Sequence, residues 1–111
     1  MATIKERFKL KADELSEEIK EILKEHGNKK IGEVVLSQIY QGMRGITGLV
    51  SETSLLDAQE GIRFRGFTIP ELQKKLPKAV NGNEPLPEGL FYLMLMGELP
   101  TENDVNDITN A

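Results

Sequence analysis

The residues best suited to ligand chemistry are three arginines in a glycine-rich stretch between positions 42 and 71. The first of them, Arg44, lies between Gly42 and Gly45, and glycines so placed are typical of a tight turn. A guanidinium presents a rigid fork of donors that suits phosphate or carboxylate. We therefore predict that Arg44 faces an anionic ligand. The alternative is a backbone that only bends sharply or packs closely against another segment.

The glycine spacing argues against two common nucleotide sites. Gly42, Gly45 and Gly48 recur every third residue. This spacing differs from the dinucleotide-binding pattern of glycines, and no Lys followed by Ser or Thr completes a P-loop. The stretch therefore predicts an anion contact at most, through Arg44.

Two further arginines, Arg63 and Arg65, are two positions apart and are predicted to lie on the same face of a strand. Together they could grip a carboxylate of a ligand. They could equally form salt bridges across a hairpin with Glu52 or Glu60. We favour the salt bridges, because pairs of opposite charge across strands are common.

This chain contains few of the side chains that usually act as nucleophiles or metal ligands. It has no cysteine, which excludes thiol nucleophiles, thiolate metal sites and disulfides from these residues. The single histidine, His26, argues against a Ser-His pair or a histidine metal site. His26 is better explained as the end of a helix, where the helix dipole favours a positive charge. We predict no catalytic residue and no metal ligand.

Composition limits the partners. The 111 residues carry a net charge of −4, so no basic field recruits nucleic acid or an anionic membrane. The longest apolar run, Leu90–Met96, is too short to span a bilayer. The first residues contain no apolar run of the kind found in signal peptides, so we expect no secretory signal. We expect a protein of the bacterial cytoplasm or the mitochondrial matrix.

The arginines must be positioned by the elements around them. Residues 1–27 are predicted to form an amphipathic helix that ends at Gly27. Residues 31–67 are predicted to hold extended segments and a hairpin. Within that region Ile31–Tyr40 alternates and is rich in β-branched residues, which favours a short, well-buried strand or extended segment. The predicted apolar stripe of the first helix consists of Ile4, Phe8, Ala12, Leu15, Ile19 and Ile22.

The predicted hairpin joins Leu49–Leu56 to Gly61–Phe67. The connecting residues 57–60 begin with Asp and precede a Gly, which is typical of a tight turn. Arg63 and Arg65 would lie on its second strand.

Residues 68–111 are predicted to be helical. Thr68 and Glu71 have capping-box spacing, and Thr101 with Asp104 repeats the signal. Between them Leu90–Met96 is apolar on every side, which predicts a helix that is buried all round. The fold class is therefore mainly α with a small β-hairpin region. Such a helix needs more neighbours than these elements supply, so we expect the N-terminal part of a larger protein or dependence on a partner.

Several motifs, in this order, resemble the N-terminal portion of citrate synthase, in the long form typical of mitochondria. They are Q-G-M-R-G at 41–45, E-T-S at 52–54 with L-D at 56–57, E-G-I-R-F-R-G at 60–66 before I-P-E at 69–71, P-L-P-E-G-L-F at 85–91 and G-E-L-P-T at 97–101. H-G-N at 26–28 also fits that form. The 2-methylcitrate synthases share much of this region.

The resemblance implies an acyltransferase that condenses acetyl-CoA with oxaloacetate and water to citrate and CoA. It also implies a mostly helical fold of two domains, a homodimer, and acetyl-CoA as a substrate rather than a permanently bound cofactor. The family's catalytic histidines and aspartate lie beyond Ala111, so the isolated 111 residues are expected to be inactive. Arg44 matches the arginine of the family's M-R-G segment, which is associated with the phosphates of CoA. The alternatives are a 2-methylcitrate synthase and a non-enzymatic interaction module.

Overall fold

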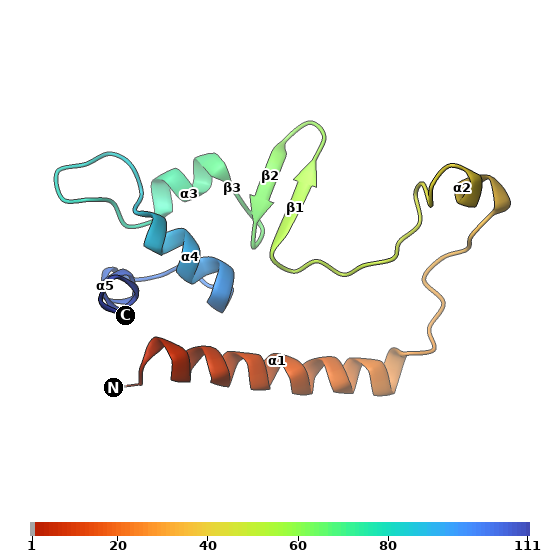
Figure 1. Cartoon of the computed structure of the whole chain (residues 1–111), viewed down its shortest axis with the longest axis horizontal. Coiled ribbons are helices and arrows are strands. Elements are labelled where there is room, and N and C mark those ends of the chain that lie inside the picture. Colours follow the sequence, from red (N-terminus) through yellow and green to blue (C-terminus); the bar gives the residue numbers. More distant parts are fainter. Residues whose placement is uncertain (1) are drawn as a thin grey trace. The chain divides into compact units, whose positions relative to one another are not determined.

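The computed structural model describes residues 2–111, which divide into two compact units. One unit holds the chain up to Glu14 together with Ser51–Ala111, and the other holds Leu15–Val50. The described residues contain five helices and one small three-stranded sheet, joined by turns and loops (Figure 1). This confirms the predicted class, mainly α with a small β region.

The first helix, α1, spans Ile4–His26, within the predicted 1–27 segment. Its start is capped reciprocally: the Thr3 amide donates to Glu6 at 2.8 Å, and the Glu6 amide donates to the Thr3 hydroxyl at 3.2 Å. The Gly27 amide donates to the Leu23 carbonyl at 2.9 Å and completes the last turn. No residue of α1 is buried, and its apolar stripe is exposed except at Ile4, which is half-buried.

The prediction of a buried strand or extended segment over Ile31–Tyr40 is wrong. Leu36–Tyr40 forms a short helix, α2, and its residues are not buried. Within residues 2–111 the segment Ile31–Tyr40 has no neighbouring strand to pair with. An unpaired strand would leave its backbone groups without hydrogen-bond partners. A helical turn satisfies them locally, and the Gln38 side chain accepts a hydrogen bond from the Val35 amide at 2.9 Å.

The predicted hairpin is confirmed, with shorter strands. Strands β1 (Ser54–Asp57) and β2 (Gly61–Phe64) pair antiparallel, and β3 (Phe67–Thr68) pairs antiparallel with β2. The Asp57 carboxylate accepts hydrogen bonds from the amides of Gln59 and Glu60, both at 2.8 Å. These bonds form the turn and lower the pKa of Asp57.

The three remaining helices start at the predicted signals. They are α3 (Ile69–Lys75), α4 (Pro87–Met96) and α5 (Glu102–Asn110). Capping boxes open α3 and α5, and a proline opens α4. Gly97 ends α4 with φ 77°, a left-handed conformation that glycine adopts without steric cost.

The core of the first unit is small and is built on α3 and α4. Leu72 from α3 and Leu76, which caps the end of α3, pack with Leu93 from α4, which is 0% exposed. Half-buried side chains from β2, β3 and α4 surround them, namely Phe64, Phe67 and Leu90, joined by Leu99. The prediction that α4 is buried on every side is wrong, because Phe91 is 54% exposed.

Candidate functional site

The turn that carries Arg44 follows α2 directly. Gly42 and Gly45 both have φ 72°, and Met43 between them has φ 63°. Three left-handed residues in four positions bend the chain sharply, which confirms the predicted tight turn. A bulky residue such as Met43 rarely adopts this conformation, so the surrounding bonds must hold it there.

The backbone of Arg44 is fixed while its side chain is exposed. Its amide donates to the Gln38 carbonyl at 3.2 Å, which ties the turn back onto α2. Within residues 2–111 the guanidinium has no hydrogen bond or ion pair. The side chain is exposed to solvent. A fixed backbone with an unengaged guanidinium is able to bind an anion.

A hollow of about 140 Å³ lies next to this turn, lined by residues 31–34 and 45–47. Its one carboxylate belongs to Glu33, which pairs with Lys30. That pairing reduces the negative charge that Glu33 presents to an incoming anion. The hollow therefore borders the turn at Gly45, and Arg44 itself does not line it.

Arg63 is engaged within the hairpin. Its Nη2 atom donates to Glu60 at 2.9 Å, and its Nη1 atom donates to the Gly66 carbonyl at 3.0 Å. The hydrogen bond to Glu60 raises the pKa of Arg63. The favoured salt bridge with Glu60 is confirmed, although it lies in the turn rather than across the strands.

Arg65 does not share the face of Arg63, so that prediction is wrong. Arg65 lies just beyond β2 with φ 49°, which breaks the strand alternation. Its Nε and Nη2 atoms donate to the Met94 carbonyl at 3.2 and 2.5 Å. Met94 lies in the last turn of α4, where carbonyls lack partners within the helix. Arg65 therefore caps α4 and forms no ion pair with Glu52.

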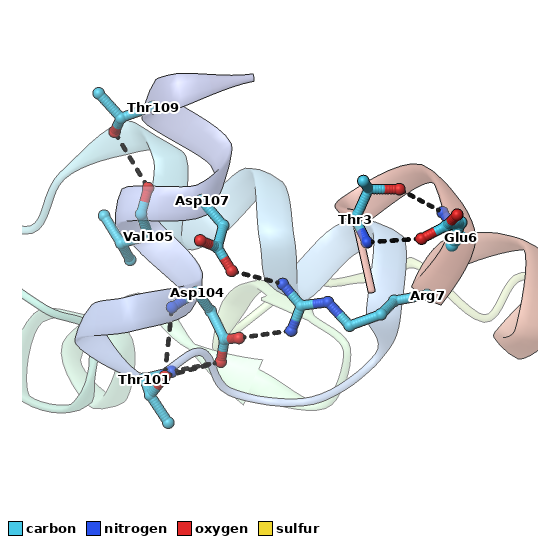
Figure 2. Close-up of polar contacts among 8 residues, drawn as sticks. All are labelled: Thr3, Glu6, Arg7, Thr101, Asp104, Val105, Asp107 and Thr109. Carbon is cyan, nitrogen blue, oxygen red and sulfur yellow. Dashed lines mark hydrogen bonds and ion pairs between the residues drawn. The ribbon is translucent and has the colours of Figure 1, made fainter. Parts of the chain in front are cut away.

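Arg7 forms a cluster with two carboxylates that was not predicted from the sequence (Figure 2). Arg7 on α1 donates through Nη1 to Asp104 at 2.7 Å and through Nη2 to Asp107 at 3.0 Å, both on α5. Burial alone would raise the pKa of Asp104, but hydrogen bonds from Thr101 and Arg7 outweigh it and lower that pKa. Because 97 positions separate Arg7 from Asp104, no local pattern could have paired them.

The described residues hold no recognisable catalytic constellation. His26 ends α1 as predicted, and its Nε2 atom lies 3.8 Å from the Glu25 carboxylate. Within residues 2–111 no group of three or more His, Cys, Asp or Glu side chains is placed to hold a metal. None of the helices in that range is long and apolar enough to cross a membrane.

Sequence comparison finds similar proteins among known enzymes. Over 107 residues the chain is 57% identical to the mitochondrial citrate synthase of Emericella nidulans and 58% identical to that of Saccharomyces cerevisiae. Both matches cover 96% of this chain. The chain is a homologue of the citrate synthases. It corresponds to their N-terminal portion and spans only 23% and 22% of the length of these two relatives.

A related enzyme matches about equally well. The mitochondrial 2-methylcitrate synthase of Yarrowia lipolytica is 59% identical over 106 residues, again 96% of this chain and 23% of the relative. No protein-family model matches the chain. The likeness to citrate synthases therefore rests on the individual relatives.

Proposed function

We propose that this chain is the N-terminal part of a citrate synthase that acts in mitochondria. The complete enzyme would join the acetyl group of acetyl-CoA to oxaloacetate and, with water, release citrate and CoA. The observation that carries this proposal is the 57–58% identity to citrate synthases across 96% of the chain. The complete protein would work as a homodimer, without nucleic acid or membrane partners and without a permanently bound cofactor.

Within that enzyme we assign Arg44 to the phosphates of CoA. Two observations support the assignment: the glycine turn and the exposed side chain. Arg63 and Arg65 are poorer candidates, because both already donate to protein oxygens. A guanidinium pairs with phosphate through two parallel hydrogen bonds, which favours Arg44 for this role.

The chemical step needs groups that these 111 residues do not bring together. Removing a proton from the acetyl methyl group requires a positioned base, and the developing enolate requires a donor. His26 is exposed at the end of α1, and among the charged groups of residues 2–111 it pairs with Glu25 alone. The acid and base would therefore come from the rest of the complete enzyme, and this chain would contribute to substrate binding.

Steady-state kinetics of the complete enzyme with Arg44→Ala tests the assignment. A lost hydrogen bond between charged groups costs about 1.5–3 kcal/mol. We therefore expect the KM for acetyl-CoA to rise by roughly ten- to a hundredfold, with little change in the KM for oxaloacetate. Lys29→Ala is the matched control, because it removes an exposed cation from the same unit. An unchanged KM for acetyl-CoA would leave Arg44 a purely structural role.

A 2-methylcitrate synthase is the second candidate, favoured by the 59% identity to the Yarrowia lipolytica enzyme. That enzyme would take a longer acyl-CoA at the same site. One extra methylene in an apolar pocket changes discrimination by only about 1–3 kcal/mol. Comparing kcat/KM for acetyl-CoA and propionyl-CoA on the complete enzyme decides between the two.

A further inference from the structure

The start of α1 contacts α5 and the segment just before it through charged side chains, not through the core. Arg7 donates to Asp104 and Asp107, and Lys11 on the next turn lies 3.3 Å from Glu98. Residues four apart lie on the same side of a helix, so Arg7 and Lys11 form one cationic line. No α1 residue is buried, and the core cluster contains none of them.

The acceptor for Arg7 is held in place before α1 docks. Asp104 accepts hydrogen bonds from the Thr101 amide at 2.8 Å and the Thr101 hydroxyl at 2.9 Å, as part of the α5 capping box. Its side chain is only 15% exposed, and that of Arg7 is 29% exposed. Figure 2 shows the Arg7 fork reaching both α5 carboxylates from one side. The Arg7–Asp104 pair is therefore the central contact of this junction.

The other contacts of the junction are weak. Asp107, Lys11 and Glu98 are half exposed, and pairs this exposed contribute little and are screened by salt. The Nε atom of Arg7 is buried without a hydrogen-bond partner within residues 2–111, which adds a cost to docking. A junction made of one good ion pair and several weak ones is able to open without disturbing the core.

Opening would have a visible consequence at Tyr92. The Arg7 guanidinium lies 5.8 Å from the centroid of the Tyr92 ring, which is 4% exposed. Burial raises the pKa of the Tyr92 hydroxyl. Departure of Arg7 would uncover the ring on the side that faces α1.

We propose that Arg7 is an ionic latch, which holds the start of α1 on α4 and α5 and releases it as a separate element while the leucine core stays folded. The core residues Leu72, Leu76 and Leu93 contact one another without help from α1, so they keep their packing after release. The latch goes beyond the proposed enzymatic function. It makes the attachment of α1 dependent on ionic strength.

A distance measurement on the full 111-residue chain tests the latch. The chain has no cysteine, so Lys5→Cys and Asn106→Cys place one spin label on α1 and one on α5 without side reactions. Double electron–electron resonance then reports the distribution of distances between the labels. We expect a single narrow distribution at low salt, and a longer, broader one at about 1 M salt, where screening removes the support of the exposed pairs made by Asp107, Lys11 and Glu98.

Variants separate the latch from general destabilisation. Arg7→Gln should give the broad distribution even at low salt, and Asp107→Asn should shift the salt dependence to lower concentration. Lys9→Gln is the matched control, because this cation of α1 pairs with Asp13 on the same helix and with no other residue in the range 2–111. It should leave the distances unchanged. In a Tyr40→Phe background, acrylamide quenching of Tyr92 should increase severalfold in Arg7→Gln.

Two results would overturn the latch. One is an unchanged label distance in Arg7→Gln and in high salt, which would mean that other contacts hold α1. The other is loss of the helical circular dichroism signal of the whole chain in Arg7→Gln, which would make Arg7 part of one cooperative unit. The salt titration of the unmutated label pair decides the question even where a variant folds poorly.

Discussion

At the scale of single residues, the arginines of this chain divide by what their guanidinium groups already bind. Arg63 and Arg65 bind protein oxygens in the hairpin and at the end of α4, and Arg7 binds two carboxylates of α5. Arg44 binds none within residues 2–111. The sequence predicted the turn at Arg44 because glycine spacing is a local signal, whereas the partners of Arg7 and Arg65 depend on packing between distant segments.

Asp104 should make the free energy of unfolding depend on pH. Its pKa is lowered in the folded chain, so its contribution is present above the ordinary pKa of ~3.9 and is lost as pH falls through the lower folded value. We predict that Asp104→Asn destabilises the chain by about 1.5 kcal/mol at neutral pH, because a charged hydrogen bond is lost. The difference should shrink as pH falls below 4 or so, measured by urea unfolding across pH. A difference that stays constant down to strong acid would contradict this role.

Arg65 should matter more for stability than Arg63. Arg65→Ala removes the donors to the Met94 carbonyl and leaves a non-glycine residue at φ 49°. We predict a loss of about 1–3 kcal/mol, because the carbonyl is then left without that donor. Arg63→Ala is the comparison, and it should cost less because its partner Glu60 is exposed. Equal losses for the two variants in denaturant unfolding would refute the capping role.

At the scale of elements, local signals predicted where helices begin, and non-local packing decided the rest. Capping boxes at Thr3, Thr68 and Thr101 act over three residues, so they are readable from the sequence. Alternation over Ile31–Tyr40 predicted the wrong element because a strand exists only with a partner strand. The exposure of Phe91 also escaped prediction, since the face of α4 that meets α3 and α5 is set by tertiary contacts.

The capping box of α3 offers a test at this scale. The Thr68 hydroxyl accepts from the Glu71 amide at 3.3 Å, and the Glu71 carboxylate accepts from the Thr68 amide at 2.9 Å. Thr68→Ala should destabilise the chain by about 1 kcal/mol, because the helix start loses a cap next to Leu72 of the core. Thr68→Ser keeps the hydroxyl and should restore most of the loss. Unfolding curves of Thr68→Ala and the unmutated chain that coincide would show that this cap is dispensable.

At the scale of the whole molecule, the chain lacks the neighbours that its apolar surfaces require. The stripe of α1 and most large side chains of residues 31–50 are exposed, and the buried core is confined to the first unit. The chain spans only 22–23% of the length of the citrate synthases to which it is similar, so those proteins are more than four times as long. Neither composition nor periodicity revealed this family; the ordered motifs from residue 41 to residue 101 did.

A chimeric enzyme tests whether this chain serves as the N-terminal part of a citrate synthase. Residues 1–111 replace the matching N-terminal part of the mitochondrial citrate synthase of Saccharomyces cerevisiae, to which they are 58% identical over 107 residues. Release of free CoA from acetyl-CoA and oxaloacetate is then measured beside the parent enzyme and the isolated chain. We predict turnover by the chimera within about tenfold of the parent, a difference of ~1.4 kcal/mol, and none by the isolated chain. A folded chimera without turnover, or turnover by the isolated chain, would contradict the proposal that this chain is the N-terminal, non-catalytic part of a citrate synthase.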